Sequence, residues 1–366
     1  MKVGILTYYN VHNHGAVLQA NALKKVLEKN GCECSFLTFE RNYDYTPNEL
    51  IKKYRISLSS IPFFIKYSIK RGISNILFNV IKNYQLNRYR NKNFVIGDRY
   101  TDYKGDLVIV GSDEVFSLEV GINPFFYGHG LCTSLVSYAA TFGPTSYDYL
   151  MEHNLDKLVS SGLSKFNSIS VRDRNSFEIL NKLGIKSEIV CDPVILYGYE
   201  NEINEYKPSI DNYIVIYSYD KNLNEFDEIR SIKSFARSKG LKIISVGYHH
   251  EWCDKNVNVT PIQLLGYFKN ASFVITDTFH GAVLSIICNT QFIVKIRENS
   301  NKLSFLLEEY GLLNRITSNF EKLDDLYNKS IDYFYVNKIV FDKREKSLKN
   351  LYEYLRFENQ GGNAHE

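Results

Sequence analysis

The chain has 366 residues, with 44 Lys and Arg, 41 Asp and Glu, and a formal net charge of +3. This length suits two domains of roughly 150 to 200 residues each, and the nearly balanced charge excludes the overall basic field expected of a nucleic-acid-binding protein. Six cysteines are scattered without a CxxC pair, which argues against a zinc site or a disulfide scaffold and favours a reducing compartment. We therefore expect no metal, no cofactor and no nucleic-acid partner.

The sequence also lacks the usual signals for export or membrane insertion. Met1 is followed at once by a strand-like segment instead of the charged and apolar regions of a signal peptide. No uninterrupted apolar run approaches the roughly 20 residues that a membrane span needs. We expect a cytoplasmic protein.

The first predicted elements are a strand from Val3 to Tyr8 and a helix from Ala16 onward, whose apolar residues have helical spacing. The turn between them contains Asn10, Asn13, His14 and Gly15. In open α/β sheets ligands bind at the carboxyl ends of the strands, where the next helix presents free N–H groups. Two interpretations remain open, a ligand site or a turn in which Asn13 caps the helix and the histidines are solvated.

A strand is predicted at 32–39, and the segment 48–94 after it has helical spacing and a strongly basic composition. Between Ile51 and Asn93 there are ten Lys and Arg residues. A basic amphipathic helix can lie on an anionic membrane surface, which predicts a peripheral contact at the inner face of the cell membrane. The alternative is a helical insertion that covers the sheet edge and has a solvated outer face.

The rest of the chain alternates strands with helices on both sides of a polar linker at 199–212. Before the linker, strands are predicted at 106–113, 134–141, 168–173 and 188–196, with a helix at 175–183. After it, strands are predicted at 213–219, 242–248, 272–278 and 291–296, with helices at 224–237, 261–269, 280–288, 300–310 and 341–357. Residues 358–366 are expected to form a disordered tail.

This alternation predicts an α/β protein with two doubly wound Rossmann-like domains that face a central cleft. The N-terminal domain is expected at 1–198, with the basic insertion inside it, and the C-terminal domain at 213–340.

Polar residues follow three predicted strands where a ligand would lie. Gly111, Ser112 and Asp113 follow a very apolar run, and Arg172 follows another strand and can offer a planar fork to a carboxylate or phosphate. Thr278, His280 and Gly281 open a helix, which can bind phosphate at its N-terminus. A structural turn, a surface salt bridge and a capping residue are the competing interpretations.

Taken together, six ordered motifs resemble the polysaccharide pyruvyl transferase family over Gly4 to about Arg315. They are NHGAVLQANALKKVL, VIVGSDEVF, SYAATFG, ISVRDRNSFEILNKLG, CDPVIL and FVITDTFHGAVLSIICNTQFI. Two motifs depart from the family pattern. Its Gly-Ser-Asp-Gln-x-Trp ends here in Glu114, Val115 and Phe116, and its Ser-Phe-His-Gly begins with Thr278. Both departures keep the polar centre of the motif, so they put substrate detail in doubt more than the reaction.

The resemblance implies a GT-B-like fold and an enzyme that transfers the enolpyruvyl-derived group of phosphoenolpyruvate to a sugar. The product would be a cyclic pyruvate ketal on a surface or capsular polysaccharide, or on its polyprenyl-linked precursor, with release of phosphate. His280 and Asp113 are the expected catalytic residues. The C-terminal domain would hold the donor, bound by Arg172, Thr278, His280, Gly281 and Arg297. The N-terminal domain would hold the sugar acceptor, bound by Asn10, Asn13, His14, Gly15, Ser112 and Asp113.

Two other classes of protein remain to be weighed. A GT-B-like glycosyltransferase that uses a nucleotide sugar would have a similar shape but would release a nucleotide instead of phosphate. A non-catalytic binding protein is disfavoured because Arg172, Asp113 and His280 are all retained.

Overall fold

The N-terminal domain is built on a seven-stranded parallel sheet in the order β3-β2-β1-β4-β5-β6-β7. The computed structural model describes residues 1–42, 61–296 and 301–361. The strands are β1 (Lys2–Leu6), β2 (Glu33–Thr38), β3 (Ile96–Arg99), β4 (Leu107–Val110), β5 (Ser134–Ala140), β6 (Ser168–Val171) and β7 (Glu188–Ile189). The helices are α1 (His14–Lys29), α3 (Ile61–Asn93), α4 (Tyr147–Glu152), α5 (Asp156–Leu163), α6 (Arg174–Lys182) and α7 (Pro193–Tyr197).

The C-terminal domain has a six-stranded parallel sheet in the order β10-β9-β8-β11-β12-β13. Its strands are β8 (Tyr213–Tyr217), β9 (Lys242–Val246), β10 (Lys255–Val257), β11 (Phe273–Thr276), β12 (Phe292–Lys295) and β13 (Ile316–Thr317). Its helices are α8 (Phe226–Ser238), α9 (Pro261–Lys269), α10 (Phe279–Ile287), α11 (Asn301–Glu309) and α12 (Leu323–Asn328), and α13 (Tyr333–Gly361) ends the described chain.

The central strands are continuous apolar runs because both faces of each sheet are covered by helices. All four residues of β4 are buried, and β1 pairs with both β2 and β4, so that Val3 lies opposite Cys34 and Leu107. One hydrophobic cluster continues from the N-terminal into the C-terminal domain, through α1 and α7 on one side and α9 and α10 on the other. The two domains therefore share a packed interface, and the expected arrangement of two doubly wound α/β domains is confirmed.

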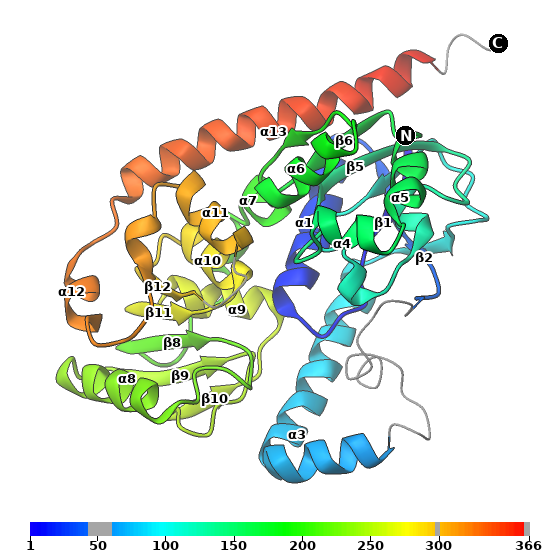
Figure 1. Ribbon diagram of the computed structural model, residues 1–366. Helices are drawn as coiled ribbons and strands as arrows, with labels where there is room; N and C mark the ends of the chain where they lie inside the picture. Colours follow the sequence, from blue (N-terminus) through cyan, green and yellow to red (C-terminus); the bar gives the residue numbers. More distant parts are fainter. Residues whose placement is uncertain (43–60, 297–300, 362–366) are drawn as a thin grey trace.

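Helix α13 returns from the C-terminal domain and lies along the N-terminal domain (Figure 1). The hydroxyl of Ser347 accepts a hydrogen bond from the backbone N–H of Cys191 at 3.0 Å, and Asn350 donates to Glu188 at 2.7 Å. The helix predicted at 341–357 is shorter than the observed α13. Helix α13 begins at Tyr333, because the Asp332 carboxylate accepts hydrogen bonds from the first free N–H groups of the helix. Its backbone stays helical through 358–361, where the sequence predicts a disordered tail.

The strand predicted at 188–196 is also wrong in its second half, because β7 ends at Ile189 and α7 follows. Asp192 caps α7 by accepting from the N–H of Val194, and Pro193 occupies the first helical position, where its missing N–H costs nothing. These two residues turn an apolar sequence that looks like a strand into one short helix.

In the predicted insertion at 48–94, residues 48–60 lie outside the described residues, and α3 extends from Ile61 to Asn93. Gly72, at φ 76° and ψ 157°, kinks α3 into two limbs. Within the described residues, no helix is long and apolar enough to cross a membrane.

Candidate functional site

Arg172, directly after β6, is buried where the two domains meet and is bound by three neighbouring side chains. Its Nη1 donates to Asp192 Oδ2 at 2.7 Å and to Gln19 Oε1 at 2.6 Å. Its Nη2 donates to Asp113 Oδ1 at 3.1 Å, and its guanidinium lies 4.6 Å from the centre of the Phe279 ring. The structure therefore excludes the surface salt bridge and brings Arg172 and Asp113 together.

Burial alone would lower the pKa of Arg172, but the carboxylates around it, first those of Asp192 and Asp113, raise that pKa above its ordinary value. Both side chains of the Arg172–Asp192 pair are almost fully buried, at 2% and 1% exposed. Arg172 Nε has no hydrogen-bond partner among the described residues. This nitrogen is a buried donor that a bound anion could use.

Gln19, on the second turn of α1, connects the two candidate site residues that come from opposite domains. Its side-chain oxygen accepts from Arg172 and also lies 3.2 Å from Nε2 of His280. Arginine can only donate, so the atom facing it must be the amide oxygen, and His280 Nε2 must therefore carry the hydrogen. Gln19 is not among the residues predicted from the sequence, although a glutamine among the apolar residues of a buried helix is a usable signal.

His280 is buried at the start of α10, against α1 of the other domain. Burial lowers its pKa to about 4; among the charged groups around it, Asp192 and Glu114 raise the pKa, whereas Arg172 and Lys302 lower it. The ring is therefore neutral at pH 7 in the ligand-free protein. A Cβ atom at Gly15 would lie 2.6 Å from Nδ1 of His280, so this close approach depends on the glycine.

The candidate residues of the opening turn have different environments: one caps a helix, one is buried between the domains and one is exposed. Asn13 caps α1 by accepting from the N–H groups of Gly15 and Ala16, and Asn10 is exposed. His14 is fully buried and donates through Nε2 to the carbonyl of Val259 in the C-terminal domain at 2.8 Å. His14 therefore lies in the domain interface and is not a solvated loop residue, and its role toward an acceptor stays a prediction.

The segment after β4 contains one partly exposed and one buried candidate residue. Asp113 adopts φ 82°, and its side chain is 20% exposed even though it binds Arg172. Ser112 is fully buried, and its hydroxyl has no hydrogen-bond partner among the described residues. Glu114 forms an ion pair with Lys302 of α11, which ties this segment to the C-terminal domain.

At the start of α10, Thr278 and Gly281, which are predicted to bind the donor substrate, stabilise the first turn of the helix. The Thr278 hydroxyl accepts from the N–H of Gly281, and a Cβ atom at Gly281 would lie 2.8 Å from that hydroxyl oxygen. Thr278 is thus the N-cap of α10. Arg297 lies outside the described residues.

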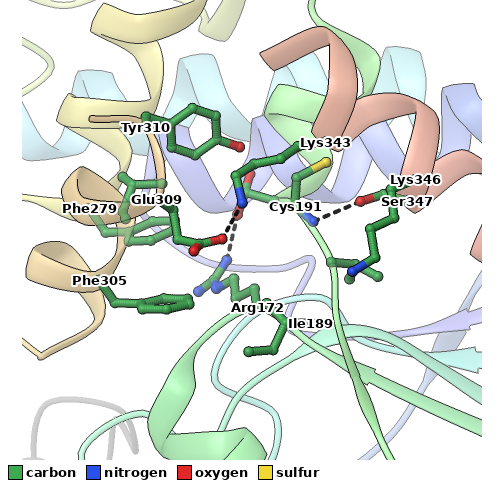
Figure 2. Close-up of a pocket in the computed structure, with 13 residues that line it drawn as sticks. Arg172, Ile189, Cys191, Phe279, Phe305, Glu309, Tyr310, Lys343, Lys346 and Ser347 are labelled. Atoms are coloured by element: carbon green, nitrogen blue, oxygen red, sulfur yellow. Dashed lines mark hydrogen bonds and ion pairs between the residues drawn. The ribbon is translucent and has the colours of Figure 1, made fainter. Parts of the chain in front are cut away.

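A cavity of about 340 Å³ lies beside Arg172, between the domains and under α13. Figure 2 shows Arg172, Glu309 and Lys343 pointing toward one another there. Lys343 forms an ion pair with Glu309, and Lys346 adds a third cation to the lining, which also contains the aromatic rings of Phe279, Phe305 and Tyr310. The two lysines were missed because α13 is far from the motifs in sequence. In the described part of the chain, no group of three His, Cys, Asp or Glu residues could hold a metal ion.

The family model of the polysaccharide pyruvyl transferases matches residues 13–299. No curated protein matches the sequence significantly.

Similar solved structures are sugar-nucleotide epimerases of GT-B-like shape. UDP-GlcNAc 2-epimerase from Methanocaldococcus jannaschii has a TM-score of 0.52 and 13% identity, covering 91% of this chain and 93% of its own. The enzyme from Rickettsia bellii has a TM-score of 0.51 and 12% identity, covering 98% of both chains. A further UDP-N-acetylglucosamine 2-epimerase has a TM-score of 0.54 and 9% identity, covering 100% and 97%. At these identities the likeness establishes the fold, which is GT-B-like.

Proposed function

Because the chain belongs to the polysaccharide pyruvyl transferase family, we propose that it transfers the enolpyruvyl-derived group of phosphoenolpyruvate to a sugar. The acceptor is a sugar of a surface or capsular polysaccharide, or of its polyprenyl-linked precursor. Two hydroxyls of that sugar become the oxygens of a cyclic ketal, and phosphate leaves.

The main support for this proposal is that Arg172 and His280, from opposite domains, both donate to the side-chain oxygen of Gln19. Phosphoenolpyruvate carries close to three negative charges at neutral pH, and the protein as a whole is nearly balanced in charge. Its attraction must therefore be local. The cavity beside Arg172 supplies that arginine together with Lys343 and Lys346, in a space with aromatic walls.

The reaction moves two protons, breaks the C–O bond to phosphate and the C=C π bond of the donor, and forms two C–O bonds to the sugar. The methylene carbon of the donor takes a proton and becomes a methyl group, and the first sugar hydroxyl attacks the neighbouring carbon. The bond to the phosphate oxygen then breaks, and the second hydroxyl closes the ring. In balance, the two hydroxyl protons end on the methyl group and on the phosphate.

In this proposal His280 supplies a proton to the donor, and Asp113 orients or deprotonates the acceptor hydroxyl. A phosphate dianion close to His280 favours the charged imidazolium, so donor binding raises the low pKa of the free protein and supplies the ring with a proton. Asp113 is held by Arg172 and is partly exposed, so its carboxylate can accept a hydrogen bond or a proton from a hydroxyl group.

The test is to mix purified protein with phosphoenolpyruvate and a panel of sugar acceptors, following phosphate release and the acceptor's gain of a pyruvate group. Arg172→Ala should weaken the apparent affinity for phosphoenolpyruvate about ten- to a hundredfold, which is roughly 1.5 to 3 kcal/mol for a charge-assisted contact. Arg172→Lys keeps a buried cation for Asp192 and should show part of this loss even if the alanine variant folds poorly.

His280→Gln should lower turnover instead, because an amide cannot supply a proton. Arg174→Ala is the matched control, because Arg174 lies two residues from Arg172 in an exposed pair with Glu308 and should change neither constant. Release of a nucleotide from a nucleotide sugar, with no phosphate from phosphoenolpyruvate, would support the glycosyltransferase alternative and overturn this assignment.

A further inference from the structure

The outer face of α3 carries a row of exposed apolar side chains. Ile73, Leu77, Val80, Ile81 and Tyr84 are 76%, 58%, 62%, 49% and 67% exposed. Their spacing of i, i+4, i+7, i+8 and i+11 places all five on one side of a helix. We call these five residues the apolar stripe, and it extends over about 17 Å of helix at 1.5 Å per residue.

The opposite face of α3 is fixed to both domains, so the direction in which the stripe faces is also fixed. Near the C-terminal domain, Asn75 donates to Asp220 at 3.1 Å, and the carbonyl of Phe78 accepts from Asn258 at 3.0 Å. Near the N-terminal domain, Arg90 donates to the carbonyl of Val11 at 2.8 Å. The limb of α3 after Gly72 is therefore anchored to both domains, and the stripe faces away from these contacts.

The charge of α3 identifies the kind of surface that the stripe fits. From Ile61 to Asn93 the sequence contains seven Lys and Arg residues and no Asp or Glu; Lys82 and Arg90 are buried against the protein, whereas Arg88 and Lys92 are exposed. Arg88 is exposed and follows Tyr84 by four residues, which puts a cation on the same face at the end of the stripe. An apolar face in a helix with only positive charge complements an anionic lipid bilayer, where apolar burial and attraction to the headgroups act together.

We propose that the apolar stripe of α3 is a membrane-docking surface, with this limb of the helix lying in the plane of an anionic bilayer. The five side chains enter the boundary between headgroups and acyl chains, and Arg88 lies at the headgroup level. The proposal concerns binding only and does not depend on the reaction proposed above.

The test is co-sedimentation of the full chain with vesicles of phosphatidylcholine and phosphatidylglycerol at three to one, and with vesicles of phosphatidylcholine alone. The wild type should bind the anionic vesicles at least tenfold more tightly than the neutral ones. Leu77→Asp combined with Ile81→Asp should weaken binding to the anionic vesicles at least tenfold and leave the melting temperature unchanged, because both side chains are exposed.

The matched control is Phe334→Asp combined with Phe341→Asp, which removes two exposed aromatic side chains from α13 and adds the same charge. This control should bind as the wild type does. Three results would overturn the proposal: wild-type protein that does not bind anionic vesicles, a stripe variant that binds as well as the wild type, or a stripe variant that melts well below it because the chain itself covers the stripe.

A fourth contrary result is wild-type protein that self-associates through the stripe without binding vesicles, since the occupant would then be a second copy. None of these measurements uses phosphoenolpyruvate. A protein that binds vesicles but releases no phosphate would support the docking surface and contradict only the proposed reaction.

Discussion

At the scale of single residues, the packing of Gly15 against His280 sets how closely the two domains approach in the site. Gly15 belongs to the first turn of α1, and His280 belongs to the first turn of α10. There is no room for a methyl group between them. The glycine therefore controls the position of an imidazole on the opposite domain.

Gly15→Ala should displace His280 and with it the contact to Gln19. We expect a loss of roughly 1 to 3 kcal/mol in unfolding free energy from overpacking, and a larger loss of phosphate release from phosphoenolpyruvate. Gly184→Ala is the control, because Gly184 has φ +72° and nothing near its Cβ position. It should cost roughly 1 to 2 kcal/mol in backbone strain and leave turnover unchanged. Equal turnover in the two variants would contradict the role given to Gly15.

Arg172, Asp113 and His280 could be selected from the sequence as candidates because each follows a strand or opens a helix, where parallel sheets present their side chains. Their roles toward a substrate stay predictions. The structure brings these three into one network. Gln19 and Asp192 were not predicted, because each contributes through a contact to Arg172 that depends on the three-dimensional arrangement.

At the scale of elements, the residue before α7, Asp192, both caps this helix and forms an ion pair. Asp192 caps the helix through one carboxylate oxygen, at 2.9 Å from the N–H of Val194, and binds Arg172 through the other. The start of α7 is thus coupled to the buried arginine.

Asp192→Asn can keep the cap with its one remaining oxygen, but its NH2 group then faces Nη1 of Arg172, where two donors meet and the ion pair is lost. Removing the charge leaves Arg172 buried with Asp113 as its remaining carboxylate partner, and we expect roughly 2 to 4 kcal/mol less unfolding free energy in urea titrations. Glu308→Gln, in the exposed pair with Arg174, should cost less than about 1 kcal/mol. Comparable losses in both variants would show that the buried pair contributes little.

Most long strands and helices could be read from periodicity, and the shorter ones could not. Strands β3, β10 and β13 have two to four residues and cannot be predicted from the sequence, because so few residues have no distinct apolar pattern. The apolar residues of α7 fit a strand as well as a helix, and the cap decides between the two structures.

At the scale of the whole molecule, two buried histidines lie where the domains meet. Burial lowers the pKa of His14 to about 3 and that of His280 to about 4, from an ordinary value of 6.5. Between those values and pH 6.5 the unfolded chain binds protons that the folded chain does not. The unfolding free energy therefore falls as the pH falls from 6.5 toward 4.

His14→Gln should make this fall less steep, because glutamine can still donate to the carbonyl of Val259 but takes up no proton. The difference in slope between wild type and variant should be at most roughly 1.4 kcal/mol per pH unit, measured by urea unfolding between pH 6.5 and pH 4. Carboxylates that titrate in this range cancel in the comparison. Parallel curves for the two proteins would show that His14 is not held neutral.

The two-domain architecture was predictable because strands and helices alternate on both sides of one linker. The relative placement of the domains was not, since it depends on contacts such as that of His14 with Val259, between residues far apart in sequence.

The return of α13 to the N-terminal domain also constrains the order in which the protein can be completed during synthesis. Ser347 and Asn350 bind the segment around β7, so that segment lacks part of its cover until α13 has left the ribosome. The first 200 residues emerge long before these partners do. The domain that is translated first is therefore finished last, and a chain that stops before α13 leaves the backbone N–H of Cys191 without the hydroxyl that accepts its hydrogen bond.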